Sequence, residues 1–421
     1  MRKGSASPAR LAAVVVAASI IVAGCQPVVS PSPAPSASST PAPKKVKIVS
    51  SLPLQSLNRV FTVPIVNAIK LALEEQGGRA GNTIVEYESY DDASAATQGY
   101  DPEVEAANAR KAAADPSIVA YIGTYNSGAA RLSIPITCQA NLAMVSPTNT
   151  YPGLTKPYES DEPGRYYPNC RRNYARVIPA DDIQGTVGAR WAKELGAVRV
   201  YVLHDGDASN LYGRVTSESF RAEANRIGLQ EVGYASARKA NVYKQLANDI
   251  AASGADFVYY GGTSGQNAGF LLRDLKQASP SIRFMGPDGI ADNFFFRQAG
   301  DKALGAYITS CCVEVKDYIG SQKTWAEKYK ARFGESADVY SIYGYEAAKV
   351  VLAAIAKAAQ RADDRAKVRD LVMATTDFDG VLGRWSFDAN GDTSLQTMAG
   401  LKIAKIGADY LSSIEFEKAL K

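Results

Sequence analysis

This chain of 421 residues has one histidine and few cysteines, and the sequence motifs of common enzymes are absent from it. The five cysteines form no Cys-x-x-Cys pair, and with His204 as the sole histidine the ligands of an ordinary zinc site are missing. The sequence contains no G-x-S-x-G elbow, no G-x-x-x-x-G-K-S/T phosphate loop and no G-x-G-x-x-G fingerprint. We therefore expect no bound metal, no cofactor and no catalytic activity.

Two sets of residues remain as enzyme candidates, and each has a simpler explanation. A Ser-His-Asp hydrolase would have to use His204, which is most simply a residue at the rim of a strand end. The adjacent carboxylates Asp91 and Asp92 would diverge at the end of a strand, so a solvated turn explains them better than acid–base catalysis. An extracellular hydrolase is thus the less favoured alternative.

Neither an excess of one charge nor a late membrane-spanning run is present. The 47 Lys and Arg residues against 43 Asp and Glu give a formal net charge of +4, and three of the basic residues, Arg2, Lys3 and Arg10, lie at the N-terminus. The remainder is nearly neutral and has no block of Lys or Arg, which argues against a nucleic-acid partner. No apolar run after the N-terminal segment is long enough to span a bilayer.

The first 25 residues have the pattern of an export signal. Basic residues precede an apolar run from Leu11 to Val22, which is followed by Ala23-Gly24-Cys25. A cysteine at this cut resembles the lipobox of bacterial lipoproteins, in which the thiol is acylated. We expect residues 1–24 to be a signal peptide and Cys25 to be lipidated, the alternative being an ordinary cleaved signal with a chance cysteine.

Residues 25–43 form the lipidated cysteine and a Pro/Ser/Ala-rich tether. The stretch 26–43 holds six prolines and five serines and has no apolar period, so it buries nothing. At about 3.1 Å per residue, a Pro-rich tether of this length reaches roughly 55 Å. The protein is predicted to be extracytoplasmic, in the periplasm or at the cell surface. Its lipid anchor would hold it on a cell membrane.

The rest of the chain, from residue 44, is too long for a single hydrophobic core, so two lobes are expected. Short apolar runs rich in Val, Ile and Tyr alternate with helical patterns, which predicts an α/β protein with parallel sheets covered on both faces. One predicted helix starts near Pro64 and stops at Gly77-Gly78, and another covers about 345–360. The predicted strands fall into two sets of five: 46–50, 83–89, 118–122, 142–146 and 174–178, then 198–203, 230–234, 257–260, 283–286 and 305–309.

Polar residues follow three of these strands, at the ends where open α/β sheets bind ligands. Asn126 and Ser127 follow the third strand, and Ser127 with the amides after it would open a helix suited to a carboxylate. Thr148 and Thr150 follow the fourth strand, and their hydroxyls and carbonyls suit an anion and an ammonium group. Asp288 follows the fourth strand of the second set and complements a cation. The pattern therefore predicts a site for a small zwitterion.

Each of these residues also has a purely structural interpretation. Asp288 precedes a helix near 291–298 and is suited to cap it, and Ser127 is equally suited to be an N-cap. Thr148 and Thr150 lie beside Pro147, where turn chemistry competes with ligand binding.

These stretches resemble the type I periplasmic binding proteins of the leucine/isoleucine/valine-binding kind, the solute receptors of branched-chain amino acid ABC importers. The resemblance covers nearly all of residues 46–406. It rests on motifs in the right order: Tyr121-Ile122-Gly123 with Asn126-Ser127-Gly128, Val145-Ser146-Pro147 with Thr150, Phe257-Val258-Tyr259-Tyr260-Gly261-Gly262, Phe284-Met285-Gly286-Pro287-Asp288-Gly289, Tyr343-Gly344-Tyr345-Glu346-Ala347-Ala348 and Asp377-Phe378-Asp379-Gly380-Val381-Leu382-Gly383.

The resemblance implies roles for individual residues. Carboxylate contacts fall on Ser127 and Thr150, and ammonium contacts on the Thr148 carbonyl, Thr150 and Asp288. Walls around the ligand side chain fall on Tyr212, Thr263 and Tyr340. Relatives often have Glu in place of Asp288 and an aromatic residue in place of Thr263, so the ligand side chain is expected to be larger or more polar than that of leucine.

The resemblance also implies two Rossmann-like lobes joined by a hinge of three crossings, near residues 178–182, 308–312 and 380–384. Lobe 1 would comprise 44–179 plus 310–381. Lobe 2 would comprise 180–309 plus 382–421, including Trp385-Ser386-Phe387-Asp388 and the run 398–406.

The implied function is that of a monomeric substrate-binding lipoprotein. It would capture an amino acid or similar small zwitterion by closure of its lobes, in the Venus flytrap manner, and deliver it to an ABC permease. The alternative is a membrane-tethered sensor that passes its closed state to a signalling partner. The sequence decides neither between these outputs nor which solute is bound.

Four cysteines remain besides Cys25, in a compartment where disulfides persist. Cys138 lies in a probable helix and Cys170 in a Pro- and Tyr-rich loop, and we expect these two to be joined, although three complete pairings are open. Cys311 and Cys312 are either a vicinal disulfide or two buried thiols.

Overall fold

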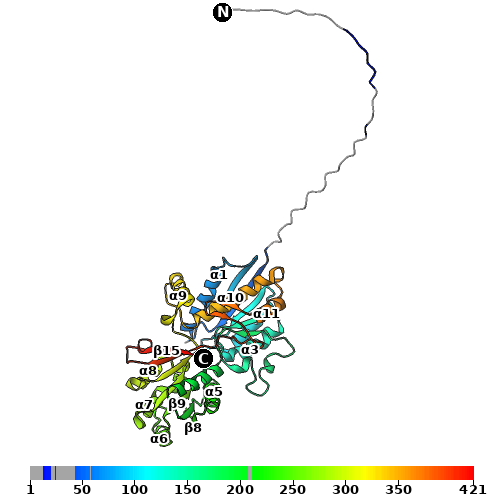
Figure 1. Ribbon diagram of the computed structural model, residues 1–421. Coiled ribbons are helices and arrows are strands. Elements are labelled where there is room, and N and C mark those ends of the chain that lie inside the picture. The colour runs from blue at the N-terminus through cyan, green and yellow to red at the C-terminus, as the bar shows by residue number, and fades with distance from the viewer. Residues whose placement is uncertain (1–12, 20–23, 25–42, 57, 98, 207–210) are drawn as a thin grey trace, which may run out of the picture. The chain divides into compact units, whose positions relative to one another are not determined.

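The computed structural model describes residues 13–19, 24, 43–56, 58–97, 99–206 and 211–421 (Figure 1). Two compact units are distinguished, Met1–Ala42 and Pro43–Lys421, and all helices and strands given below belong to the second. Cys25 and nearly all of the predicted tether lie outside the described residues. None of the described helices is long and apolar enough to cross a membrane.

The first sheet has the strand order β2-β3-β1-β4-β5-β6, and all of its pairs are parallel except β2 with β3. Ile48 and Ile122 pack on one face with helices α1, α9, α10 and α11, whereas Val49 and Tyr121 pack on the other with α2 and α3. This alternation along each strand is what a sheet covered on both faces requires. The elements of this lobe are β1 (Lys45–Leu52), α1 (Arg59–Glu74), β2 (Arg79–Ala80), β3 (Thr83–Asp91), α2 (Pro102–Ala114), β4 (Ile118–Gly123), α3 (Ser127–Gln139), β5 (Ala143–Ser146), η1 (Pro152–Leu154), η2 (Gly164–Tyr166), β6 (Tyr174–Arg176), η6 (Val315–Asp317), α9 (Gly320–Phe333), α10 (Ser341–Ala358), η7 (Ala359–Arg361), α11 (Arg365–Met373), β12 (Phe378–Gly380) and β13 (Gly383–Trp385).

The second sheet has the order β15-β14-β11-β10-β9-β7-β8, parallel from β8 to β11 and antiparallel at β14 and β15. Val202 packs with α4 and α5 on one face, and Leu203 packs with α6, α7 and α8 on the other. The elements of this lobe are α4 (Asp181–Glu194), β7 (Arg199–His204), α5 (Tyr212–Arg226), β8 (Gln230–Ser236), α6 (Lys244–Ala252), β9 (Phe257–Gly261), η3 (Ser264–Gln266), α7 (Ala268–Ala278), β10 (Arg283–Pro287), η4 (Asp288–Ile290), α8 (Asn293–Ala299), η5 (Gly300–Ala303), β11 (Tyr307–Ser310), β14 (Met398–Ile403), α12 (Tyr410–Ser413) and β15 (Ile414–Leu420).

The two sheets are wound alike. Within the first, the parallel strands run β3-β1-β4-β5-β6, and within the second they run β8-β7-β9-β10-β11, which is the same order relative to the chain. The predicted α/β class with two Rossmann-like lobes is confirmed, and all ten predicted strands are present with shifts of a few residues at most. The short hairpin of β12 and β13 and the C-terminal strands β14 and β15 were not predicted as strands.

Helix α1 begins at Arg59, so the predicted start near Pro64 is wrong. Pro64 lies inside the helix, where it has no N–H to donate to the carbonyl four residues earlier. That carbonyl belongs to Val60, which is 67% exposed, so water can satisfy it. The helix continues through the proline to Glu74.

The segment after the β12–β13 hairpin belongs to lobe 1, contrary to the predicted boundary at residue 382. Trp385 and Phe387 are buried in the core that α1 and α10 share with the first sheet, and Phe387 N donates to Thr375 O at 3.0 Å. Burial of these two aromatic side chains holds the segment in lobe 1. The chain joins the second sheet only at Met398.

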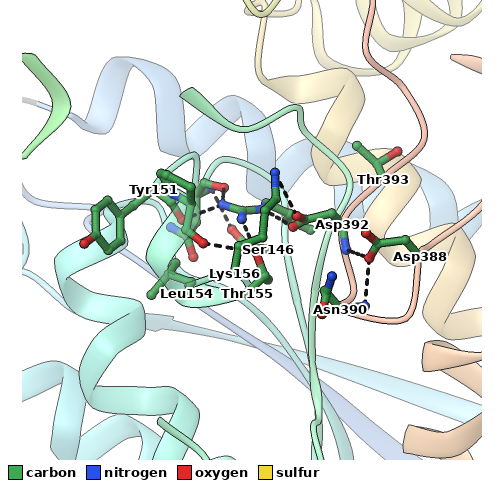
Figure 2. Close-up of polar contacts among 12 residues, drawn as sticks. Ser146, Tyr151, Leu154, Thr155, Lys156, Asp388, Asn390, Asp392 and Thr393 are labelled. Atoms are coloured by element: carbon green, nitrogen blue, oxygen red, sulfur yellow. Dashed lines mark hydrogen bonds and ion pairs between the residues drawn. The ribbon is translucent and has the colours of Figure 1, made fainter. Parts of the chain in front are cut away.

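A buried arginine ties this returning segment to lobe 1. The Arg176 side chain at the end of β6 is 0% exposed, and its Nε donates to Asp392 Oδ1 at 2.7 Å. Its other nitrogens donate to Tyr151 O at 2.7 Å and to the Thr155 hydroxyl. Figure 2 shows these polar contacts, with Asp388 and Asn390 in the turn that precedes Asp392. This network of hydrogen bonds and ion pairs joins β6, the loop after β5 and the third crossing between the lobes.

Asp392 remains ionised in this network. Burial acts to raise the pKa of its carboxyl, but the charges of Arg176 and Lys156 outweigh burial, and the pKa is lowered. Lys156 Nζ lies 3.4 Å from Asp392 Oδ2 and 2.9 Å from Asp182 Oδ2, so the network extends to the start of α4 in lobe 2.

We expect Arg176→Met to lower the free energy of unfolding by about 3–5 kcal/mol, because it leaves the Asp392 carboxylate and two backbone carbonyls without their buried partner. Urea unfolding followed by tryptophan fluorescence measures the change. Arg171→Met is the control, since Arg171 is 75% exposed and its pair with Asp370 is expected to contribute less than about 1 kcal/mol. Equal effects of the two substitutions would contradict the role given to Arg176.

Candidate functional site

A cavity of about 490 Å³ lies where the carboxyl ends of strands from both sheets meet. From lobe 1 it is lined by the segments after β4 and β5, and from lobe 2 by the starts of α4 and α5 and the segments after β9 and β10. All eight ligand-binding residues predicted from the sequence line this one cavity: Asn126, Ser127, Thr148, Thr150, Tyr212, Thr263, Asp288 and Tyr340.

The start of α3 forms one wall. Asn126 occupies the N-cap position with an extended backbone, and Ser127 is the first helical residue, so the N-cap interpretation of Ser127 is wrong. Ser127 Oγ accepts a hydrogen bond from Tyr151 N at 3.3 Å. The amides of Ser127 and Gly128 precede those that bond to Asn126 O, so they are free to donate to an anion.

The loop after β5 is held in place by its own side chains. Ser146 Oγ accepts from Asn149 N at 2.9 Å, so the hydroxyl that holds the turn beside Pro147 is that of Ser146 and not of Thr148 or Thr150. The Thr148 hydroxyl donates to Tyr125 O at 3.0 Å, so its carbonyl rather than its hydroxyl is left for a ligand. Thr150 O accepts from Asp181 N at 2.9 Å, which joins lobe 1 to the first residue of α4.

Asp288 forms the acidic wall in lobe 2. Its Oδ1 accepts from the Tyr212 hydroxyl, and its Oδ2 accepts from Cys311 N at 3.1 Å. The interpretation of Asp288 as the cap of α8 is wrong, because Asp292 caps that helix by accepting from Phe294 N and Phe295 N. Asp288 is therefore free of a capping role and faces the cavity.

A second acid in the wall, Asp181, was missed. It is the first residue of α4 and almost completely buried. Burial, and next the charge of Asp288, raise its pKa to about 8. The sequence offered a signal, since Asp181 lies within the crossing predicted near 178–182, but that stretch was interpreted only as a hinge. The cavity wall thus has a second carboxyl, Asp181, that stays largely protonated near neutral pH.

Tyrosines supply most of the remaining wall. Tyr125 and Tyr340 meet edge to face with ring centres 5.9 Å apart, and Phe61 packs against both from behind. Tyr340 and Tyr212 were predicted as walls. Further lining residues were missed, because they lie in segments whose packing the sequence does not reveal: Tyr100, Tyr125, Gly128, Arg131, Tyr151, Asp181, Leu211, Gly289 and Cys311.

The structure joins Cys138 and Cys170 in a disulfide with an S–S distance of 2.06 Å. Cys311 and Cys312 are free buried thiols, with their sulfur atoms 2.7 Å apart in a hydrogen bond. That bond and burial raise the pKa of the Cys311 thiol, so it stays protonated near neutral pH. Cys311 thus lines the cavity as a protonated thiol, and Cys312 lies beside it in the core.

The enzyme candidates lie apart from the cavity. His204 ends β7, and its Nδ1 accepts from Gly206 N at 3.1 Å. Asp92 is 0% exposed, so its interpretation as part of a solvated turn is wrong, and burial together with Glu105 raises its pKa to about 9. Among the described residues, no group of three or more His, Cys, Asp or Glu side chains is arranged to hold a metal ion.

Comparison with known proteins places this fold and site in context. Residues 45–408 match the family described as "Periplasmic binding protein". An "Amino acid binding protein" of Pseudomonas aeruginosa is 26% identical over 294 residues, which is 69% of this chain and 73% of that protein. The Leu/Ile/Val-binding protein BraC3 of Rhizobium johnstonii is 27% identical over 340 residues, which is 80% of this chain and 85% of that protein.

Solved structures show the same architecture. A leucine binding protein, LivK, from Thermotoga maritima superposes with a TM-score of 0.70 at 24% identity, covering 89% of this chain and 98% of that one. An ABC transporter substrate-binding protein from Desulfitobacterium hafniense in complex with Leu also gives a TM-score of 0.70, at 20% identity, with coverage of 89% and 100%. At these identities the likeness concerns the fold.

The raised pKa of Asp181 predicts a pH-dependent stability. The folded state keeps a proton that the unfolded carboxyl loses near pH 4, so the stability present below pH 4 falls as the pH rises towards about 8. Asp181→Asn removes this dependence, and we expect the ligand-free variant to gain on the order of 2 kcal/mol over the wild type between pH 5 and pH 7.

Urea unfolding of ligand-free protein at the two pH values measures this gain. Asp182→Asn is the control, because the Asp182 side chain is 35% exposed beside Lys156 and does not line the cavity. The same pH slope in the wild type and in Asp181→Asn would refute the assignment.

Proposed function

The chain belongs to the periplasmic binding protein family, whose members bind solutes and are not enzymes, and from this premise we propose that it captures an α-amino acid between its lobes. In this proposal it is the extracytoplasmic receptor of an ABC importer. The ligand bridges the two lobes, and the closed form is the one that the permease recognises.

One observation carries the proposal: groups suited to an anion and a group suited to a cation face the same cavity from different lobes. The amides at the start of α3, with Ser127 and Thr150, suit an α-carboxylate in lobe 1. Asp288 suits an α-ammonium group in lobe 2. Asn126 Oδ1 is buried without a hydrogen-bond partner among the described residues, so a ligand N–H would satisfy it.

The names of the relatives support an amino acid as the ligand. One is an "Amino acid binding protein", several are Leu/Ile/Val-binding proteins, and one is a "Leucine-, isoleucine-, valine-, threonine-, and alanine-binding protein". The ligands in these names share an α-amino group and an α-carboxyl group.

Closure follows from where the contacts lie. A ligand favours the closed form only by the difference between its contacts with the closed and open forms. We propose that Ser127, Thr148 and Thr150 bind first and that Tyr212 and Asp288 arrive on closure. The lobes also meet directly, since the Tyr158 hydroxyl donates to Glu218 Oε2 and Arg214 Nη2 donates to Glu159 Oε1, each at 2.7 Å.

The membrane attachment belongs to the same proposal. Acylated Cys25 would hold the chain on the membrane, and the tether 26–43 would let a monomeric receptor reach a permease. Several acyl chains at about 0.8 kcal/mol per buried methylene anchor a protein stably without a spanning helix.

Binding of amino acids to the purified protein is the direct test. Thermal-shift measurements against a panel of amino acids, amides and small acids should give a rise in Tm with at least one α-amino acid, because a ligand at 100 times its Kd adds about 2.7 kcal/mol. Asp288→Asn should raise the Kd at least tenfold by calorimetry, because the ammonium group loses its counter-charge. Asp301→Asn should leave the Kd unchanged, because the Asp301 side chain is 78% exposed and does not line the cavity. No stabilisation by any α-amino acid, or an unaltered Kd in Asp288→Asn, would refute the proposal.

Cell fractionation tests the lipid anchor. The wild type should sediment with membranes, and Cys25→Ser should appear in the soluble extracytoplasmic fraction with the same ligand affinity, because the lipid attachment is remote from the cavity. Ser32→Ala, in the tether, should fractionate as the wild type does. A Cys25→Ser protein that still sediments with membranes would exclude acylation at this cysteine as the anchor.

A further inference from the structure

Arg131 is a cation in the wall of the cavity. It was not predicted from the sequence, and the proposed contacts with the α-amino and α-carboxyl groups of the ligand do not involve it. It lies on α3 four residues after Ser127, so the two side chains are neighbours on one face of the helix. Its side chain is 34% exposed and lines the same cavity as Ser127 and Thr150.

The guanidinium of Arg131 has donors to spare. Among the described residues none of its nitrogens makes a hydrogen bond, and its nearest charged neighbour is Glu162 Oε1 at 3.6 Å. The ring of Tyr151 lies 4.4 Å from the guanidinium carbon, which fixes one side of the group. Five N–H groups on a rigid plane therefore stand at the cavity with no acceptor at hydrogen-bond distance.

Glu162 does not satisfy the hydrogen-bond donors of the Arg131 guanidinium. Its carboxylate accepts from the Tyr151 hydroxyl at 2.6 Å, from the Tyr166 hydroxyl at 2.5 Å and from Glu159 N at 3.2 Å. These three bonds tie together the loop after β5. The carboxylate is thus engaged, and its long approach to Arg131 leaves room for a second, better-placed anion.

We propose that Arg131 binds a second carboxylate of the ligand, and that the solute is an acidic α-amino acid such as glutamate. This inference rests on the proposed function, because it takes the α-carboxylate to lie at the start of α3 and the α-ammonium at Asp288. The side-chain carboxylate then lies one helical turn along α3, at Arg131. Charges are complementary at all three points, and a planar guanidinium is the side chain best matched to a carboxylate.

A neutral aliphatic ligand fits this wall less well. Closure over a leucine side chain would remove water from the Arg131 guanidinium without supplying an acceptor, which is unfavourable for a charged group. Thr263, on the opposite lobe, is a small polar wall residue, so it does not supply the apolar surface that an aliphatic side chain needs. Both features agree with a polar rather than a branched apolar side chain.

The test compares glutamate with glutamine, which has almost the same shape and no side-chain charge. Calorimetry on the full-length protein, with L-leucine and glutarate as further ligands, should give a Kd for glutamate at least tenfold lower than for glutamine or leucine. Glutarate lacks the ammonium group and should bind at least tenfold more weakly than glutamate.

Substitution then assigns the preference to one residue. Arg131→Gln should bring the ratio of the glutamine and glutamate Kd values close to one, and Arg131→Lys should retain part of the preference. Arg165→Gln is the matched control, because Arg165 lies 51% exposed beside Asp161 and does not line the cavity. Far-UV circular dichroism and Tm establish that each variant is folded.

The outcomes separate this inference from the function on which it rests. A wild type that binds glutamine or leucine as tightly as glutamate, or a folded Arg131→Gln protein with an unchanged ratio, overturns the role of Arg131 and leaves amino acid binding intact. Glutarate binding as tightly as glutamate, or no binding of any amino acid, overturns the proposed function itself. If Arg131→Gln does not fold, the ratio in the wild type still decides.

Discussion

The architecture depends on one buried ion pair at the junction of the lobes. Arg176 ends β6, so it lies where lobe 1 passes into α4, and Asp392 lies on the segment that returns from lobe 1 to the second sheet. A guanidinium with no solvent exposure is stable only with its partners in place, and those partners come from two separate stretches of the chain, the loop after β5 and the segment that holds Asp392. The pair therefore fixes the first and third crossings relative to the loop after β5, and that loop carries Thr148 and Thr150.

The cavity separates its charges between the lobes. Lobe 1 contributes helix-start amides and Arg131, whereas lobe 2 contributes Asp288 and Asp181. Burial, and next the charge of Asp288, raise the pKa of Asp181, so Asp181 keeps its proton near neutral pH in the absence of a ligand. An ammonium group placed between them would favour loss of the Asp181 proton. In the proposed complex, ligand binding and the protonation of this wall would therefore be coupled through lobe 2.

The sequence predicted the strands and the strand-end residues well, because both follow from local signals. Buried parallel strands such as Ile118–Gly123 are continuous apolar runs, and polar residues directly after them must lie at the edge where the lobes meet. Tertiary packing decided what the sequence did not reveal. Trp385 lies in lobe 1 because its ring fills that core, and Arg131 reaches the cavity because helix geometry puts it above Ser127. Asp181 was visible in the sequence, but its burial was not.

Some cavity residues are placed by local signals and others by tertiary packing. This difference explains why a shared fold does not determine which solute is bound. The residues proposed to meet the α-amino and α-carboxyl groups lie at strand ends and a helix start, positions that the sheet topology itself fixes. The residues proposed to meet the ligand side chain, among them Arg131, Thr263 and Tyr340, come from a helix interior and from segments between elements, where the backbone does not constrain the side chain. A change from an aliphatic to an acidic ligand therefore needs few substitutions and no change of fold. Specificity in this chain is expected to differ from that of its relatives at these positions first.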